Sequence, residues 1–237
     1  MKKFYESVMS SIVDEYNTMR SNLSLMTVFY TIQYFKPKTI LEMGFYEGQT
    51  FGIMIEAAEP GCELTAIDIE YRMQLFDRYY ATSDKIADKK INLLNIDSRN
   101  FKSESTFDFI NVDTYNEKSE INLRWNDFLH AVDLLSKDGI LMLDNYILME
   151  TLLSTYLQQD PKIVPFFKDS QALYFHHVDH NANNFLDLFI PQTFPKEFAS
   201  TFNTDFYGHL VTDIDPVPVF IHNYGCLMRA YCQMVKI

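Results

Sequence analysis

Apolar residues recur along this chain with two different periods. Short and nearly continuous apolar runs alternate with segments in which apolar residues recur every three to four positions, as on one face of a helix. The strand-like runs are Thr39–Leu41, Leu64–Ile67, Ile91–Ile96, Phe107–Val112 and Ile140–Leu143. The helix-like segments are Gly52–Ala58, Arg72–Ile86 and Ile121–Leu135. Because strands that are covered on both faces carry such continuous apolar runs, the pattern predicts a Rossmann-like, doubly wound α/β fold with a mostly parallel sheet.

The two ends of the chain differ from this alternating middle part. Apolar positions before Pro37 recur in helical steps, and Pro37 would stop a helix, so N-terminal helices are predicted. Six of the eight prolines lie in the last third, where Lys162–His176 and Val217–Tyr231 resemble hairpins and predict antiparallel edge strands. An aromatic-rich C-terminal extension follows, which either caps a substrate pocket or forms an interface in a homo-oligomer. The predicted parts are N-terminal helices at 1–36, an α/β core at 37–177 and the extension at 178–237.

Charge and cysteine content narrow the class of protein. The chain of 237 residues carries a formal net charge of -12, which repels phosphate backbones and anionic lipid headgroups, so nucleic-acid and membrane partners are not expected. Three cysteines are too few for a disulfide framework. Neither a signal peptide nor an apolar run long enough to span a membrane is recognisable. These features predict a soluble, cytoplasmic protein.

Glycine is scarce, so the positions at which it occurs are informative. Of seven glycines, three fall within nine positions, Gly44, Gly48 and Gly52. This cluster follows a predicted strand and opens a predicted helix, which is where the backbone of an α/β sheet approaches a nucleotide ligand. A further glycine, Gly139, closes the segment Ser136–Gly139, which is predicted to be a turn that ends a helix.

The spacing within the cluster argues against a dinucleotide. Gly44 and Gly48 are spaced Gly-x-x-x-Gly, so the dinucleotide fingerprint Gly-x-Gly-x-x-Gly is absent. Tyr46 and Glu47 occupy the positions where a pyrophosphate would be bound. An acidic residue there disfavours a phosphate ligand and favours a ligand with positive charge.

Acidic residues end several of the predicted strands. They are Asp68, Asp97, Asp113 and Asp144, with Ser98 and Asn145 directly after two of them. Because the carboxyl ends of parallel strands lie along one edge of a sheet, these side chains and Glu42 are expected to converge on the edge where such sheets bind ligands. A carboxylate at the end of the second strand, here Asp68, can accept hydrogen bonds from both hydroxyls of a ribose.

The stretch from Leu41 to Asn145 resembles the class I S-adenosylmethionine-dependent methyltransferases. Its motifs Glu-Met-Gly-Phe-Tyr-Glu-Gly-Gln-Thr, Phe-Asp-Phe-Ile-Asn-Val-Asp and Leu-Asp-Asn are similar to those of the catechol-type, cation-dependent O-methyltransferases and of related small-molecule and sugar-tailoring enzymes. The resemblance implies that the glycine loop wraps the methionine part of the cofactor, that the second-strand acid holds the ribose and that the residues after the third strand border the adenine. The implied cofactor residues are Glu42, Gly44, Gly48, Asp68, Asp97 and Ser98, with Glu70 as a second candidate for the ribose.

The same resemblance implies a metal site at Asp113, Asp144 and Asn145. Two carboxylates and an amide oxygen are hard ligands suited to Mg²⁺, which would orient a substrate hydroxyl and lower its pKa. Catechol-type enzymes carry a lysine where this chain has Asn116, so the general base is Asp113, a metal-bound hydroxide or His130. The ring of Tyr46 either lies against the sulfonium or only packs in the loop.

The predicted function is S-adenosylmethionine-dependent O-methylation of a small molecule with a sugar or phenol-like hydroxyl, with Mg²⁺ assistance. Asp113 and Tyr46 are the candidate catalytic residues. After Asp113 the sequence lacks the Pro-Pro pair that marks DNA amino-methyltransferases, which agrees with the acidic charge in disfavouring nucleic acid. Two alternatives stay open: a metal-independent N- or carboxyl-methyltransferase, and a non-catalytic binding or assembly module with a methyltransferase-like fold.

Overall fold

The computed structural model describes the greater part of the predicted α/β core. The described residues are 28–29, 31–73, 76–77, 86–114, 120–159, 161–168 and 172–177. The chain divides into two compact units, one of Met1–Val164 with Lys168–His180 and one of Pro165–Phe167 with Asn181–Ile237, and nearly all described residues belong to the first. Most of the predicted N-terminal helices and of the helix Arg72–Ile86, and all of the hairpin Val217–Tyr231 and the extension at 178–237, lie outside the described residues.

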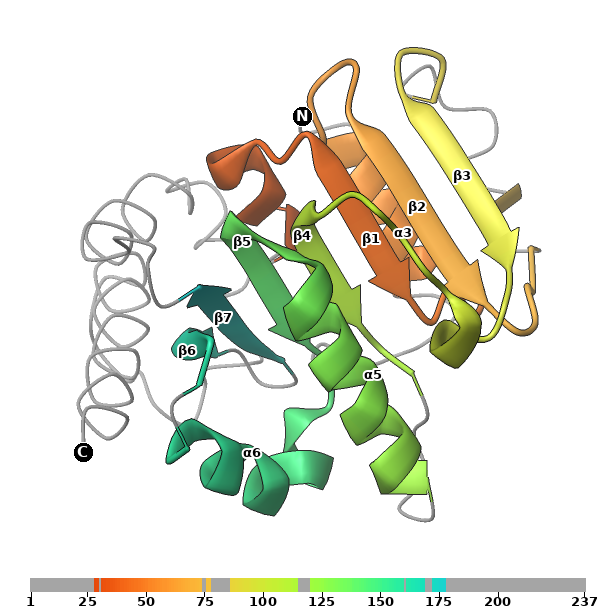
Figure 1. The fold of residues 1–237 in the computed structure, drawn as a ribbon. Helices are drawn as coiled ribbons and strands as arrows, with labels where there is room; N and C mark the ends of the chain where they lie inside the picture. The colour runs from red at the N-terminus through yellow and green to blue at the C-terminus, as the bar shows by residue number, and fades with distance from the viewer. Residues whose placement is uncertain are drawn as a thin grey trace, which may run out of the picture. The chain divides into compact units, whose positions relative to one another are not determined.

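A seven-stranded sheet forms the centre of the described part of the chain (Figure 1). Its strands are β1 (Thr39–Met43), β2 (Glu63–Asp68), β3 (Lys90–Asn95), β4 (Phe107–Val112), β5 (Leu135–Leu143), β6 (Ile163–Lys168) and β7 (Leu173–His177). They are arranged in the order β3-β2-β1-β4-β5-β7-β6. Neighbours from β3 to β5 pair in parallel, and β7 pairs antiparallel with β5. The predicted doubly wound, mostly parallel sheet with antiparallel pairing toward one edge is therefore confirmed.

Helices lie on both faces of this sheet, as the continuous apolar strands require. The helices are α3 (Gln49–Ala57), α5 (Ile121–Leu134) and α6 (Glu150–Leu157), with 3-10 turns η1 (Ser98–Asn100) and η3 (Tyr146–Met149). In Figure 1, α5 crosses in front of the sheet and α3 lies behind it. Ile40, Leu41 and Met43 of β1 are completely buried between these layers. Among the described residues, no helix is both long and apolar enough to cross a membrane.

The connection from α5 to β5 differs from the predicted turn. Leu135 directly follows α5 and already pairs with Phe107 of β4, whereas the next pair joins Phe109 to Ile140. The prediction of a turn at Ser136–Gly139 is wrong, because these residues belong to β5 and bulge from its pairing with β4. A side chain at 139 would be crowded, since a Cβ atom there would lie 2.8 Å from Cδ1 of Leu135 and 3.0 Å from the carbonyl oxygen of Phe107.

The strand order reverses between β1 and β4, and the glycine cluster begins at this point. The chain runs outward from β1 through β2 to β3 and then returns to the other side of β1 as β4. The amide of Asp113 donates to the carbonyl of Met43 over 2.8 Å, which draws the ends of both strands together. Gly44 adopts φ +96°, and a Cβ atom on it would lie 2.2 Å from the carbonyl oxygen of Asp113. No side chain fits at this position without moving the β4 end.

Two of the glycines with positive φ, Gly44 and Gly61, allow this crowding to be tested. We expect Gly44→Ala to lower the free energy of unfolding by about 2–5 kcal/mol, from backbone strain and displacement of Asp113 together. Gly61 has φ +82°, and a Cβ atom on it would have nothing within 4 Å, so Gly61→Ala should cost only about 1–2 kcal/mol. Urea unfolding of both variants measures the difference, and equal losses would show that the contact with Asp113 is not the constraint.

Candidate functional site

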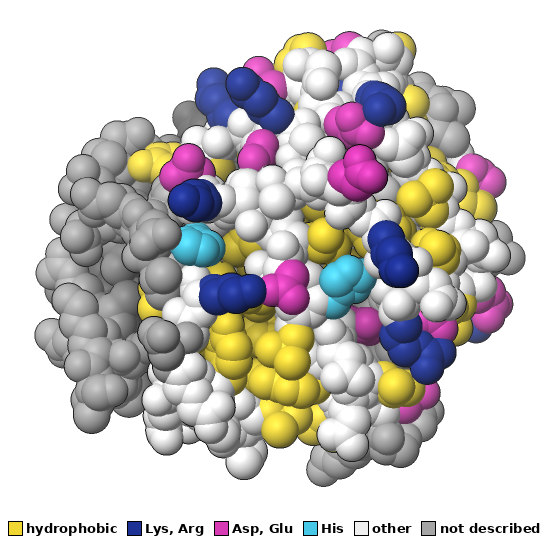
Figure 2. Space-filling view, viewed as in Figure 1, with side chains coloured by type: hydrophobic (Ala, Val, Ile, Leu, Met, Phe, Trp, Pro, Cys, Tyr) yellow, Lys and Arg dark blue, Asp and Glu magenta, His cyan; other side chains and the backbone are white. Residues whose placement is uncertain are grey.

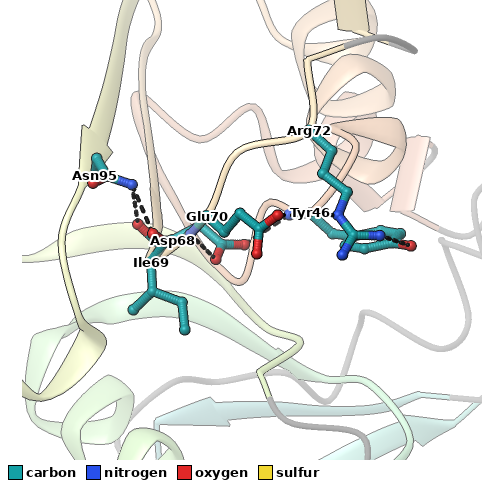
Figure 3. A network of polar contacts seen from close by, with 6 residues as sticks. All are labelled: Tyr46, Asp68, Ile69, Glu70, Arg72 and Asn95. Carbon is teal, nitrogen blue, oxygen red and sulfur yellow. Dashed lines mark hydrogen bonds and ion pairs between the residues drawn. The ribbon is translucent and has the colours of Figure 1, made fainter.

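The loop after β1 is held in place by the carboxylate of Asp68 at the end of β2 (Figure 3). Its Oδ2 accepts hydrogen bonds from the amides of Phe45 over 2.8 Å and Tyr46 over 2.7 Å. Its Oδ1 accepts from the amide of Glu70 over 3.0 Å. The positive φ of Gly44 and Tyr46 accompanies this arrangement, in which two successive amides are directed toward one anion. Asp68 therefore ties the glycine loop to the end of β2.

The loop is also anchored from the opposite side by the ring of Phe45. This ring is buried and makes edge or tilted contacts with Phe51 at 5.6 Å, Tyr71 at 4.8 Å and Phe76 at 5.5 Å between ring centroids. A Cβ atom at Gly48 would lie 2.4 Å from Cζ of Phe45, so the second glycine of the motif makes room for this ring. The loop thus packs inward through Phe45 and is exposed through Tyr46, which is 54% exposed.

The ring of Tyr46 makes a cation–π contact with a side chain of the same protein, Arg72. The guanidinium carbon of Arg72 lies 4.8 Å from the ring centroid, and Nη1 of Arg72 donates to the Tyr46 hydroxyl over 3.0 Å. Nε of Arg72 also lies 3.5 Å from Oε1 of Glu70, which completes the exposed group seen in Figure 3. The Tyr46 ring, which the sequence offers as a candidate contact for the cofactor sulfonium, is therefore in contact with Arg72 in this structure.

Glu42 is the most deeply buried acid of the site. It is 1% exposed in β1, and Oε1 accepts a hydrogen bond from Nδ2 of Asn111 in β4 over 3.2 Å. The other oxygen, Oε2, has no hydrogen-bond partner. Burial raises the pKa of Glu42 well above its ordinary value, and the negative charges of Asp113, Asp68 and Asp144 raise it further. A buried carboxyl with one unsatisfied oxygen can accept a hydrogen bond from a cationic ligand.

The predicted metal residues are adjacent at the ends of β4 and β5. Asp144 accepts a hydrogen bond from Nδ2 of Asn145 over 2.7 Å, and Asn145 adopts φ 44° at the start of η3. Burial raises the pKa of Asp113, while the nearby guanidinium of Arg124 and a hydrogen bond with Asp144 lower it. Among the described residues, no group of three or more His, Cys, Asp and Glu side chains has metal-binding geometry. The candidate donors here are two carboxylates and an amide.

Two charged residues of α5 belong to this region although the sequence did not single them out. Arg124 and Asp127 are each only 1% exposed and lie on the same face of α5, three positions apart. Asp127 lies against Ser98 and Thr114, whose hydroxyls lower its pKa, although burial raises it more strongly. The sequence contained one indication that both residues are buried, because they lie on the helical face that also carries Phe128 and Ala131.

The predicted adenine-border residues Asp97 and Ser98 follow β3. The carboxylate of Asp97 caps η1 by accepting from the amide of Arg99 over 2.9 Å, and it also pairs with the side chain of Arg99. These contacts lower the pKa of Asp97 to about 2. His130, one candidate base, packs beside Phe101 with 6.4 Å between ring centroids. Asn116 lies outside the described residues.

Comparison with known proteins identifies the fold. No protein-family model matches this sequence, and no curated protein matches it either. Among solved structures, the SAH-bound methyltransferase PaMTH1 of Podospora anserina is 20% identical with a TM-score of 0.52, and the match covers 75% of this chain and 87% of that one. A proposed O-methyltransferase of Klebsiella pneumoniae is 10% identical with a TM-score of 0.53, covering 75% and 89%.

A third solved structure extends the range of methyl acceptors found with this architecture. The N-methyltransferase NodS of Bradyrhizobium japonicum is 15% identical with a TM-score of 0.50, and the match covers 69% of this chain and 98% of that one. At such identities the likeness defines the fold but not the acceptor. The described residues of this chain have the Rossmann-like fold of class I methyltransferases.

Proposed function

We propose that this protein is an S-adenosylmethionine-dependent methyltransferase that methylates a hydroxyl of a small molecule. The observation that carries the proposal is the electrostatics of the strand ends at the switch point: the buried carboxyl of Glu42 interacts with Asp113, Asp68 and Asp144. Such a concentration of negative potential favours a ligand with positive charge, and S-adenosylmethionine has both a sulfonium and an ammonium group. Open α/β sheets bind ligands at this point of the strand order.

The residues around the glycine loop have distinct roles in this proposal. The unsatisfied Oε2 of Glu42 and the loop at Gly44–Gly48 would receive the methionine part of the cofactor. Oδ2 of Asp68 already accepts two backbone hydrogen bonds and Oδ1 accepts one, so Asp68 can offer the ribose Oδ1. The carboxylate of Glu70 would accept a hydrogen bond from the second ribose hydroxyl. Asp97 and Ser98 would border the adenine.

The acceptor end of the proposed site is formed by Asp113, Asp144 and Asn145. Their hard oxygen donors fit Mg²⁺, which when bound would polarise the acceptor hydroxyl and lower its pKa. Asp113 would accept the proton of that hydroxyl, since it lies where β1 and β4 meet beside the glycine loop. Tyr46 would line the path of the methyl group with its exposed ring.

The charge of the protein supports a small-molecule acceptor. On the face shown in Figure 2, Lys and Arg side chains are interspersed with Asp and Glu and do not gather into a basic stripe. The formal net charge of -12 also opposes the approach of a polyanion. A neutral sugar or phenol needs no basic surface for binding and is not repelled by the negative charge.

Calorimetric titration with S-adenosylmethionine tests the proposal directly. The wild-type chain should bind the cofactor, and Asp68→Asn should bind it at least about tenfold more weakly, because the variant disturbs both the loop and a ribose contact. Asp133→Asn is the matched control, since Asp133 lies in an exposed ion pair with Lys162 near the far end of α5. A folded wild-type protein that binds no cofactor would refute the methyltransferase proposal.

The buried carboxyl of Glu42 predicts a dependence of stability on pH. Because its pKa is raised in the folded state, ionisation of Glu42 destabilises the free protein as pH rises above about 4.5, the ordinary value. Glu42→Gln should therefore stabilise the free protein by about 1–3 kcal/mol near pH 8 and by less near pH 5. Thermal melting at both pH values checks the sign.

The same variant separates a ligand-binding role of Glu42 from a purely structural one. Loss of the negative charge should weaken binding of S-adenosylmethionine even though the free protein becomes more stable. Unchanged cofactor affinity, or a stability gain that is independent of pH, would contradict the assignment of Glu42.

Metal removal distinguishes the proposed mechanism from its metal-independent alternative. A screen of phenols and sugars for methylated product first identifies an acceptor. EDTA and Asp144→Asn should each lower methyl transfer by about a hundredfold or more, and added Mg²⁺ should restore the EDTA-treated wild type. Cofactor affinity should stay within about threefold, because the cofactor contacts come mainly from β1 and β2. Activity that survives both treatments would contradict the metal-assisted mechanism and favour metal-independent methyl transfer.

A further inference from the structure

Arg124 is a buried cation that has no role assigned in the proposed function. It lies in α5, is 1% exposed and is the largest fully buried side chain among the described residues. Burial of a guanidinium is unfavourable unless hydrogen bonds and an opposite charge compensate for the lost hydration. Its partners therefore indicate why the residue is there.

The partners of Arg124 lie just beyond the ends of β4 and β5. Nη1 donates to the carbonyl of Thr114 and Nη2 to the carbonyl of Asp144. Nη2 also forms an ion pair at 3.9 Å with Oδ1 of Asp113, a buried oxygen that has no hydrogen-bond partner. One side chain thus contacts both strand ends that carry the proposed acceptor site.

These contacts begin where the backbone hydrogen bonds between β4 and β5 end. The last register pair of β4 and β5 joins Val112 to Leu143, and the last backbone bond runs from the amide of Asp144 to the carbonyl of Val112 over 3.1 Å. The next carbonyls, of Thr114 and Asp144, bind the guanidinium instead. Arg124 therefore continues the connection between the strands beyond their ladder.

The shape of the guanidinium suits this connection better than an ammonium would. Its planar fork offers several N–H groups in fixed directions, so it can serve two carbonyls and stay beside a carboxylate. A lysine keeps the charge but offers a single compact donor group at the end of a flexible stem. Replacing Arg124 by Lys therefore removes the geometry and preserves the charge.

We propose that Arg124 is a positioning residue that holds the ends of β4 and β5 together, so that Asp113 and Asp144 face the acceptor. As an account of catalysis the proposal rests on the proposed function. The connection between the strands can be measured without any ligand. Arg124 itself contacts backbone carbonyls and Asp113 and is not assigned a chemical step.

Amide hydrogen exchange of the full chain tests this inference. In Arg124→Lys, the amide of Asp144, which donates to Val112 and closes the β4–β5 ladder, should exchange at least about tenfold faster. The amide of Asp113, which donates to Met43 of β1 at the same end of β4, should be accelerated with it, because the guanidinium lies beside the Asp113 side chain. The amides of Gly44 and Ile96, which end the hydrogen bonding of β1 and β3 with β2, should keep their wild-type exchange rates. Arg124→Gln, which also loses the charge, should show the same pattern and serves if the lysine variant does not fold.

Val132→Ala is the control for a general loss of stability. Val132 is buried on α5 but lies more than two helical turns from Arg124, so this variant should lower the melting temperature without accelerating Asp113 and Asp144 selectively. Unchanged exchange at Asp113 and Asp144 in the Arg124 variants would overturn the proposal. So would a pattern identical to that of Val132→Ala, because it would indicate a structural role only.

Cofactor titration separates this inference from the proposed function. Arg124→Lys should bind S-adenosylmethionine with an affinity within about threefold of the wild type, because Glu42 and Asp68 lie on β1 and β2. A wild-type chain that binds no S-adenosylmethionine would refute the proposed function while leaving the exchange test valid. A loss of cofactor affinity of about tenfold or more in Arg124→Lys would contradict a role confined to β4 and β5.

Discussion

The close approach of Gly44 to the carbonyl of Asp113 is the constraint on which the candidate site depends. It brings the ends of β1 and β4 together where the strand order reverses, and it leaves no room for a side chain at position 44. The chain then leaves β1 through a loop in which the amides of Phe45 and Tyr46 are directed toward Asp68. The same short segment therefore joins the ends of β1, β2 and β4.

Negative charge accumulates at this junction, and the protein compensates for it only in part. Asn111 satisfies one oxygen of Glu42, and Arg124 lies beside Asp113. Burial and mutual repulsion still raise the pKa of Glu42. Because ionised carboxylates are costly in such surroundings, an arriving cation would recover part of that cost on binding. The same charges that limit the stability of the free protein therefore favour a cationic ligand.

The sequence predicted the strands and their order of appearance well, because the central strands β1 and β4 are nearly continuous apolar runs that are buried on both faces. It did not predict the path of Ser136–Gly139, where packing of Gly139 against Phe107 replaces a helix-ending turn. It also missed Asn111, Arg124 and Asp127. A polar residue in an apolar pattern does not reveal its partners, since these come from distant parts of the chain.

The sequence by itself determined the fold class and the acidic strand ends, because hydrophobic periodicity and the parallel connection of strands place those residues along one edge. Only the tertiary structure decided how each carboxylate is used. Asp68 is largely engaged by the backbone of the glycine loop, Glu42 retains an unsatisfied oxygen, and Asp113 lies beside a buried guanidinium. These differences depend on burial and on hydrogen-bond geometry between residues far apart in the chain, which local sequence does not specify.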